Sequence, residues 1–434
     1  MKVAIYTLGC KVNQYESAAL AQELKRSGAQ VVDFAEFADA YIINTCSVTA
    51  ESDRKSRSII NRAVKKNPAA LICVTGCYAQ LRPERIGAIP GVDIVTGTKD
   101  KMEIARLIME SGGRKTKLSR VRDPFALRYF EPMRLSEAYE RTRMSIKIED
   151  GCDNFCSYCV IPYARGPIVS KAFSDIESEI AAAVERGYKE IVLTGIHISS
   201  YGKDMKFEKR LTDVLDMCES VKGDFRVRLG SLNLSCFDED FLSRLPRYKR
   251  LCPHFHISLQ SGCDRTLQAM NRKYTAAEFE DTLVRIREVL PESSVTTDVI
   301  VGFPGETEED FSKSLDFVRR QQFLKVHVFP FSSRPGTKAE GMPGHHTRAE
   351  KARPGAIMSE AARETAERFL DMQLGKTKTV LIEEKTGENT YRGYTENYIM
   401  TEVHSKKPIE GELFRVKLLK RQGETLSGEL CGAD

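Results

Sequence analysis

The sequence predicts an α/β protein in three parts: an open parallel α/β N-terminal domain, a central (βα)6-type partial barrel, and a small C-terminal antiparallel β-barrel. Strand-like and helix-like segments alternate in the first part, and a longer alternation with six strand candidates follows from about residue 141. The last part has only short strand-like runs separated by turns. Strand–helix alternation is typical of parallel sheets, whereas successive short strands form antiparallel barrels. The expected boundaries are 1–113, a basic linker at 114–140, 141–370 and 371–434.

The first domain begins with the strand-like KVAIYTL, which precedes the helical ESAALAQELKRSGA. AYIINT precedes the helical ESDRKSRSIINRAVKKN, which stops at Pro68, and the strands ALICVT and VDIVTGT follow. Because the connections are short, we expect an open sheet of parallel strands with helices on both faces.

A basic segment follows, in which residues 114–143 carry nine Lys or Arg against four acids. We interpret it as a linker or hairpin. Its charge suits either a solvated face or a strip that faces RNA phosphates.

The central strand candidates are MSIKIED, EIVLTGI, FRVRLGS, HFHISLQ, SVTTDVIVGF and KVHVFPF. Six βα units form an incomplete barrel, since a full one needs eight. The helical AEKARPGAIMSEAARETAERFLDMQLG closes this part, although Pro354 lies near its start. The strands of the last part are KTVLIEEK, TYRGYTENYIMTEV, GELFRVKLLKRQ and TLSGEL.

Composition is ordinary for a globular protein, with 41% hydrophobic and 29% charged residues. No apolar run approaches the ~20 residues of a membrane helix, so we expect a cytoplasmic protein without a membrane partner. A net charge of +5 permits a nucleic-acid partner without requiring one. Twelve cysteines indicate metal ligands together with buried thiols.

The strongest local signal is the spacing of Cys152, Cys156 and Cys159 just after the first central strand. Three thiolates at this spacing can bind three irons of a four-iron cluster and leave the fourth open. A zinc site is the alternative, but it lacks a nearby fourth ligand as well.

A second set comprises Cys10, Cys46 and Cys77, each of which follows a predicted parallel strand. The carboxyl ends of such strands share one edge of a sheet, and ligands bind there. We therefore predict a second three-cysteine cluster site. Cys73 lies inside its strand and is expected in the core, and the other five cysteines have no ligand spacing: Cys218, Cys236, Cys252, Cys263 and Cys431.

The first set resembles the cluster motif of the radical S-adenosylmethionine superfamily. The resemblance implies that the open iron binds S-adenosylmethionine and that an electron from the cluster splits it into a 5′-deoxyadenosyl radical. It also implies that Tyr158 lies against the adenine and that Gly195 approaches the methionine amino group. Ser231, Gln260 and Gly302 are expected to line the rest of this site.

Seven segments in order are similar to the methylthiotransferase family, from TLGCKVNQYES, NTCSVTAESDRKSR and VTGCYAQ to CDNFCSYCVIPYARGPIVSK, LTGIHISSYG, HISLQSGCDRTLQAMNRKYT and TDVIVGFPGETEEDF. The last part resembles the RNA-binding TRAM module of these enzymes. The resemblance implies two 4Fe–4S clusters. The cluster that delivers sulfur is held by Cys10, Cys46 and Cys77. The cluster that binds S-adenosylmethionine is held by Cys152, Cys156 and Cys159. GCKVNQYES resembles the branch that acts on N6-threonylcarbamoyladenosine beside the anticodon of tRNA.

The resemblance also implies an electron donor such as a flavodoxin or ferredoxin. Rival hypotheses are the branch acting on N6-isopentenyladenosine, the branch acting on a ribosomal-protein aspartate, and a non-catalytic iron–sulfur RNA-binding protein. Arg165 or a linker arginine is expected to bind the substrate carboxylate. Four aromatic residues of the last part either stack on bases or pack within the barrel: Tyr391, Tyr394, Tyr398 and Phe414.

Overall fold

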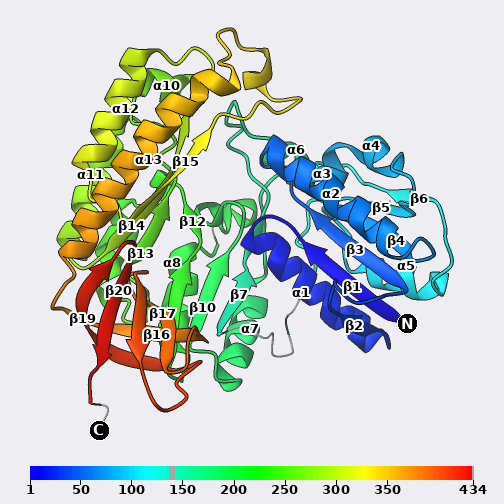
Figure 1. The fold of residues 1–434 in the computed structure, drawn as a ribbon, viewed down its shortest axis with the longest axis horizontal. Helices are drawn as coiled ribbons and strands as arrows, with labels where there is room; N and C mark the ends of the chain where they lie inside the picture. Colours follow the sequence, from blue (N-terminus) through cyan, green and yellow to red (C-terminus); the bar gives the residue numbers. More distant parts are fainter. Residues whose placement is uncertain (134, 136–141, 207, 433–434) are drawn as a thin grey trace.

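The computed structural model describes residues 1–133, 135, 142–206 and 208–432, which form a mixed α/β structure (Figure 1). A six-stranded sheet, a central pair of curved parallel sheets and a closed five-stranded barrel follow one another along the chain. The predicted α/β fold class is confirmed.

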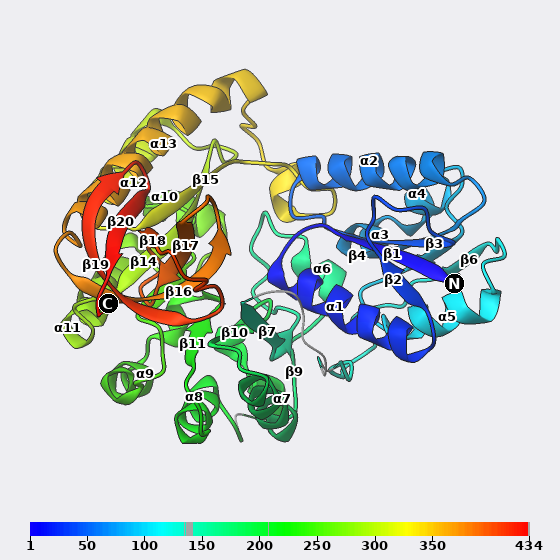
Figure 2. The same ribbon diagram turned by 60° about the horizontal axis from the view of Figure 1, so that its bottom comes forward.

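The N-terminal sheet is parallel throughout and has the strand order β2-β1-β3-β4-β5-β6. Figure 2 shows α2 on one face and α1 and α5 on the other, and each face carries its own apolar core. The strands are β1 (Lys2–Thr7), β2 (Gln30–Val32), β3 (Ala40–Thr45), β4 (Leu71–Gly76), β5 (Ile94–Thr96) and β6 (Leu118–Arg120). The helices are α1 (Lys11–Arg26), α2 (Ala50–Lys66), α3 (Cys77–Leu81), α4 (Pro83–Gly87) and α5 (Glu103–Ser111).

Part of the basic segment belongs to this sheet, because β6 pairs with β5 as its edge strand. Several of its cations are bound to acids of the same domain: Arg120 contacts Glu103, and Arg122 Nε lies 2.7 Å from Asp100 Oδ2. These pairs favour the solvated-face interpretation for this half of the segment. Arg134 and Arg141 lie outside the described residues.

The six expected central strands are present, with the third broken at Gly230 into β11 and β12. This break divides the strands into two parallel sheets, β11-β10-β7 and β12-β13-β14-β15. The strands are β7 (Arg143–Lys147), β10 (Glu190–Thr194), β11 (Arg226–Leu229), β12 (Ser231–Leu232), β13 (His254–Ile257), β14 (Ser294–Val301) and β15 (Lys325–Pro330), with a short ribbon of β8 (Glu149–Asp150) and β9 (Val169–Ser170). The helices are α6 (Ile161–Arg165), α7 (Phe173–Glu185), α8 (Leu211–Ser220), α9 (Glu239–Arg244), α10 (Asp264–Ala269), α11 (Ala276–Val289), α12 (Glu308–Arg320) and α13 (Arg348–Asp371).

Helix α13 runs through Pro354 without interruption. It begins with a capping box, in which Thr347 Oγ1 accepts from Glu350 N and the Glu350 carboxylate accepts from Thr347 N. Pro354 is the seventh residue of the helix, beyond the first turn, so its missing N–H removes one i→i−4 hydrogen bond, and the helix nevertheless continues to Asp371.

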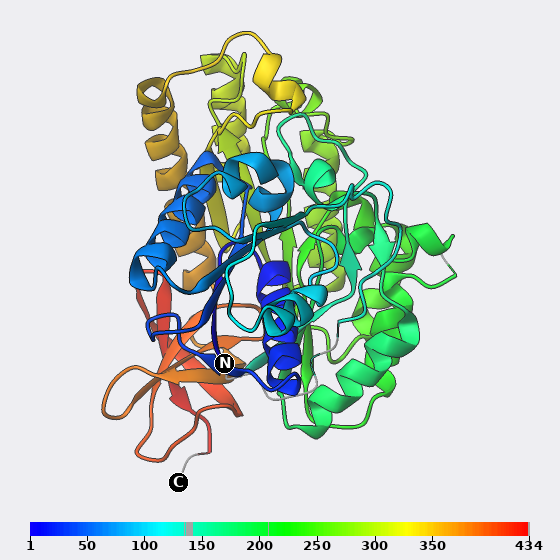
Figure 3. The same ribbon diagram turned by 90° about the vertical axis from the view of Figure 1, so that its right-hand side faces the viewer.

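The C-terminal barrel closes in the order β16-β17-β18-β20-β19. Four strand pairs are antiparallel as predicted, and β18 and β20 pair in parallel. Its strands are β16 (Thr377–Lys385), β17 (Thr390–Thr395), β18 (Met400–His404), β19 (Leu413–Gln422) and β20 (Thr425–Leu430). Figures 1 and 3 show it in orange and red beside the central domain.

The predicted strand TYRGYTENYIMTEV is a hairpin of β17 and β18. Tyr398 has φ +68° in its turn, where Thr395 Oγ1 accepts from Ile399 N. Among the described residues, no helix has the length and apolar character needed to cross a membrane.

Candidate active site

The first cysteine set gathers at the carboxyl edge of the N-terminal sheet. Cys10 follows β1 at the start of α1, Cys46 follows β3 and Cys77 follows β4. A Cβ added at Gly9 would lie 2.9 Å from Cys46 Sγ, so only glycine, here with φ +99°, brings the Cys10 loop this close. Burial, together with the neighbouring Cys46 and Cys10, raises the pKa of Cys77 to about 11. The three thiols therefore lie near one another.

The second set lies on the loop between β8 and α6. Cys152 N donates to Gly166 O over 3.1 Å, and Cys159 N donates to Cys156 O over 2.9 Å. Burial, together with the neighbouring Cys156, raises the pKa of Cys152 and of Cys159 to about 12. This set therefore also forms one group of thiols.

Arg272 brings a positive charge to the second set, because its Nη1 lies 3.4 Å from Cys156 Sγ. It also donates to Ser258 O and Tyr274 Oη, at 3.1 and 3.0 Å. Arg272 lies in MNRKYT, but no local pattern indicates that its side chain returns to the cysteine loop.

The remaining cysteines are separate from the two sets. Cys73 is fully buried in the sheet core, as expected. Four others are buried and one is exposed: Cys218, Cys236, Cys252, Cys263 and, at the surface, Cys431.

A cavity of about 610 Å³ lies where the three parts of the chain meet. Cys10 and Lys11 line it from the N-terminal domain, and Gly195 and Ser231 line it from the ends of β10 and the start of β12. Tyr398 lines it from the C-terminal barrel. One cysteine of the first set and two residues expected near S-adenosylmethionine thus share a cavity.

Of the other residues expected there, Tyr158 packs with Phe303 and Phe331. Gln260 has φ +70° and bonds through its backbone to β14, where its N donates to Asp298 O over 2.8 Å. Gly302 lines a separate hollow beside α13. The structure therefore joins Gly195 and Ser231 in this cavity, and it leaves Tyr158, Gln260 and Gly302 outside the cavity lining.

Glu149 lies beside Gly195, where an added Cβ would be 2.7 Å from Glu149 Oε2. This oxygen accepts from His197 N over 2.6 Å. The other oxygen, Oε1, is buried and has no hydrogen-bond partner among the described residues. Burial raises the pKa of Glu149 well above its usual range.

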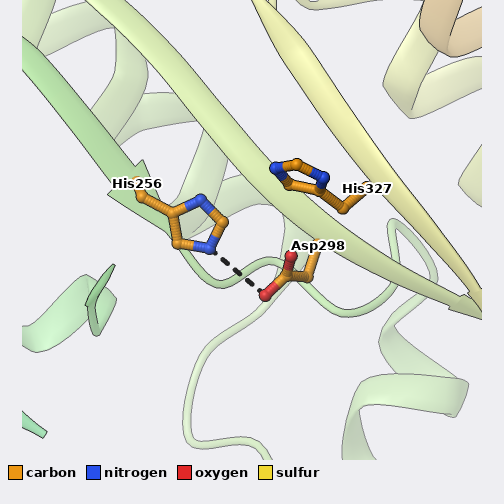
Figure 4. A group of neighbouring side chains, drawn as sticks. All are labelled: His256, Asp298 and His327. Atoms are coloured by element: carbon orange, nitrogen blue, oxygen red, sulfur yellow. Dashed lines mark hydrogen bonds and ion pairs between the residues drawn. The ribbon is translucent and has the colours of Figure 1, made fainter. Parts of the chain in front are cut away.

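Polar side chains from three neighbouring strands meet in the central domain: His256 of β13, Asp298 of β14 and His327 of β15 (Figure 4). Their ligand atoms lie within 4.8 Å of one another, a spacing that a metal ion can bridge. However, His256 hydrogen-bonds through both ring nitrogens, to Thr296 Oγ1 at 3.0 Å and to Asp298 Oδ2 at 3.2 Å. We therefore regard the group as a polar wall next to the cavity.

Three arginines converge on the buried carboxylate of Glu190. Arg143, Arg226 and Arg228 place their Nε atoms 3.1, 2.6 and 2.8 Å from its oxygens. Although burial opposes its ionisation, these arginines hold the pKa of Glu190 well below its usual range. Arg143 also pairs with Glu383 of the C-terminal barrel.

The same arginines attach the barrel to the central domain. Arg226 donates to Thr379 O and Tyr394 O at 3.0 and 2.9 Å, and Arg228 donates to Thr395 O and Glu396 O at 3.2 and 3.1 Å. The barrel is therefore held as part of the cavity wall.

The four aromatic residues of the barrel lie in two places. Tyr391 is buried in the barrel core, and Phe414 packs against that core. Tyr394 and Tyr398 instead stack at a centroid distance of 4.8 Å, and Tyr398 stacks on His254 at 4.4 Å. They line the cavity, where their partners are protein side chains.

A buried ion-pair network joins the N-terminal and central domains. Arg165 has no exposed surface, and its Nη1 lies 2.8 Å from Glu16 Oε1 and 3.0 Å from Asp150 Oδ1. Its Nη2 donates to Asn13 Oδ1 over 2.7 Å. The hypothesis that Arg165 binds the substrate carboxylate is wrong, because protein carboxylates already occupy its guanidinium.

Two family models match the chain: "Uncharacterized protein family UPF0004" over residues 2–97 and "Radical SAM superfamily" over residues 146–318. The threonylcarbamoyladenosine tRNA methylthiotransferase MtaB of Bacillus subtilis is 40% identical over 425 residues, which cover 96% of this chain and 94% of that protein. The protein of the same name from Thermotoga maritima is 40% identical over 422 residues, covering 97% and 95%. The tRNA-2-methylthio-N(6)-dimethylallyladenosine synthase of Thermodesulfovibrio yellowstonii is 32% identical over 432 residues, covering 99% and 98%.

Among solved structures, the radical S-adenosylmethionine methyltransferase TsrM of Kitasatospora setae, with cobalamin and a 4Fe–4S cluster bound, aligns with a TM-score of 0.57 and 16% identity. The alignment covers 78% of this chain and 73% of that one, and it supports the fold alone. Fold and family matches together define a radical S-adenosylmethionine enzyme. Within that class, the chain belongs to the methylthiotransferase family, whose members are transferases that carry 4Fe–4S clusters and use S-adenosylmethionine. The family resemblance is confirmed.

Proposed function

We propose that this protein inserts a methylthio group at carbon 2 of N6-threonylcarbamoyladenosine, next to the anticodon of tRNA. The observation that carries the proposal is the cavity that joins Cys10 to Gly195 and Ser231, in a chain 40% identical over nearly its whole length to proteins named for this activity. Anticodon loops present unstacked bases, which suit capture in such a cavity.

We assign the first cluster, which delivers sulfur, to Cys10, Cys46 and Cys77, and the S-adenosylmethionine-binding cluster to Cys152, Cys156 and Cys159. Each set offers three thiols, and three thiolates leave one iron of a four-iron cluster open. Without a metal, burial favours the neutral thiols of Cys77, Cys152 and Cys159 by raising their pKa values, and a bound cluster would supply the positive charge that stabilises their thiolates. When bound, the cofactors supply reductive cleavage of S-adenosylmethionine and the transferred sulfur.

The chain's own residues hold these sites in place. The guanidinium of Arg272 beside Cys156 offsets negative charge at the second set. The Arg165 network fixes the N-terminal domain against the β8–α6 loop. Neither role requires either arginine to contact substrate.

The unpartnered Glu149 Oε1 fits the methionine end of S-adenosylmethionine. It is buried beside Gly195, so it offers an acceptor for an ammonium group at the place where Gly195 is expected to approach it. Tyr158, Ser231, Gln260 and Gly302 remain part of the proposed site. Replacing Glu149 with Leu should weaken binding of S-adenosylmethionine, as measured by equilibrium dialysis.

We further infer that the protein acts on tRNA in the cytoplasm and that a flavodoxin- or ferredoxin-like protein supplies the electrons. Mass spectrometry of tRNA nucleosides from cells with and without the gene tests the substrate. We expect 2-methylthio-N6-threonylcarbamoyladenosine to disappear without the protein and its unmethylthiolated form to accumulate.

Loss of 2-methylthio-N6-isopentenyladenosine instead would favour the sister branch, and an unchanged nucleoside profile would refute the proposal. Co-purification of a small ribosomal protein in place of tRNA would favour the ribosomal branch. Absence of S-adenosylmethionine cleavage by the reconstituted protein would favour a non-catalytic RNA-binding protein.

A further inference from the structure

Lys11 is a cation of the cavity wall whose charge the protein does not balance. Among the residues that the structure describes, no acceptor or carboxylate contacts its ammonium group. The other lysine of the wall, Lys325, is paired, with its Nζ 2.9 Å from Glu424 Oε2. Lys11 is thus open to the cavity and available to a ligand.

The surroundings of Lys11 carry surplus positive charge. Arg143 and Arg228 are among its electrostatic neighbours, as are the carboxylates of Glu190 and Glu383. Arg226 shares Glu190 with these two arginines. A neighbouring hollow that Lys11 also lines adds Arg186, Glu384 and Glu410. Five cationic side chains therefore stand against four carboxylates, and this surplus favours an anionic group beside Lys11.

The position of Lys11 distinguishes this anion from the carboxylate of S-adenosylmethionine. Its neighbours Arg143 and His254 are the first residues of β7 and β13. The loop that carries Cys152 instead follows the last residue of β7, and a five-residue strand separates its two ends by about 13 Å. The surplus charge is therefore at the amino ends of the central strands, away from the second cysteine set.

A free carboxylate distinguishes the substrate that we propose. In N6-threonylcarbamoyladenosine the threonyl group is joined through its nitrogen, so its carboxyl group remains free and is ionised at neutral pH. We propose that Lys11 binds this carboxylate and so selects the threonylcarbamoyl side chain in the cavity. The assignment rests on the proposed function.

The test compares wild type with Lys11→Met, Lys11→Arg and a surface control, Lys65→Met, which changes an exposed lysine of α2. The substrates are an anticodon stem–loop with N6-threonylcarbamoyladenosine and the same stem–loop with its methyl ester. We expect Lys11→Met to lower kcat/KM for the acid substrate by about 10- to 100-fold, the usual effect of losing a charged hydrogen bond. Lys11→Arg should retain most activity, and Lys65→Met should match wild type.

The ester separates the substrate carboxylate from other anions. The kcat/KM of the wild type should be lower on the methyl ester than on the acid by a similar factor. The kcat/KM of Lys11→Met should be the same on the ester as on the acid. Cluster spectra and 5′-deoxyadenosine formed without RNA should be unchanged in Lys11→Met. Because the ester changes only the substrate, this comparison holds even for a poorly folded variant.

If wild type and Lys11→Met had equal kcat/KM on the acid substrate, the assignment of Lys11 would be overturned while the proposed function would stand. The same would follow if Lys11→Met lost the same factor in kcat/KM on the ester as on the acid. Loss of 5′-deoxyadenosine formation in Lys11→Met would also overturn it, because Lys11 would then serve S-adenosylmethionine. Wild type without activity on the acid stem–loop would refute the proposed function and, with it, this assignment.

Discussion

Glu190→Gln tests whether the arginine cluster is held together by one carboxylate. The Glu190 side chain is fully buried, and its oxygens lie 2.6 to 3.1 Å from the Nε atoms of three arginines. Glutamine has nearly the same shape, but it is neutral and turns an N–H₂ donor toward guanidinium donors. The three arginines would therefore stay buried without the negative charge that now balances theirs.

The expected cost follows from the burial of all four groups. Removing one partner of a buried ion pair costs about 3–5 kcal/mol, and we expect about 3 kcal/mol here because the remaining amide oxygen keeps one acceptor. For a domain of roughly 230 residues this corresponds to a fall in Tm of about 6–12 °C. Since the chain has no tryptophan, circular dichroism is the suitable probe.

The pH dependence gives a second check. The folded-state pKa of Glu190 is depressed below its ordinary value of 4.5, so its contribution to stability is fully present above that pH and is lost as pH falls below it. The difference in Tm between wild type and Glu190→Gln should therefore be constant from pH 8 to 6. Glu185→Gln, an exposed change at the end of α7, should alter stability by less than about 0.5 kcal/mol. A Glu190→Gln effect as small as this control, or a difference that closes between pH 8 and 6, would refute the reasoning.

The other predictions concern the clusters and the barrel. Replacing Cys152, Cys156 and Cys159 with Ala should halve the iron of the reconstituted protein, from about eight to about four per chain, and abolish S-adenosylmethionine cleavage; iron analysis showing both clusters intact would contradict the assignment. Replacing Cys10, Cys46 and Cys77 should leave 5′-deoxyadenosine formation and remove the methylthio product, and a folded variant that lost both would argue against a dedicated sulfur-delivering cluster. Deleting residues 371–434 should weaken tRNA binding and also lower the Tm, because Arg226 and Arg228 lose their carbonyl acceptors; unchanged salt-dependent tRNA affinity would exclude the barrel as an RNA-binding module.

The main elements could be predicted because their patterns are local. The long helices and the strands before Cys10, Cys46 and Cys77 have clear alternation, and the shared edge of a parallel sheet then brought these cysteines together. Strands β2 and β6 were missed because each has only three residues without a clear apolar run around them, as β5 has, and β6 lies in a run of charge. The turn between β17 and β18 was missed because Tyr398, rather than glycine, adopts the positive φ.

The site beyond the cysteines depends on long-range contacts that no local pattern contains. Lys11 is an ordinary lysine in the sequence, and only the fold shows that it lines a cavity where no carboxylate of the described residues contacts its ammonium group. Glu149 is likewise an ordinary acid at a strand end until the fold buries one of its oxygens. Such residues are identified by what they lack, and a missing partner can be recognised only in three dimensions.

Arg165 shows what such contacts add to the proposed chemistry. Its sequence position near Cys159 suggested substrate binding, yet one of its two carboxylate partners, Glu16, lies 149 residues away. The same guanidinium contacts Asn13, three residues after Cys10, and Asp150, two residues before Cys152. One buried side chain therefore connects the start of α1, next to the Cys10 loop, with the loop that carries the second cysteine set. Since both segments are fixed through the same rigid fork, the relative position of the two sets is determined by the folded protein before any substrate binds.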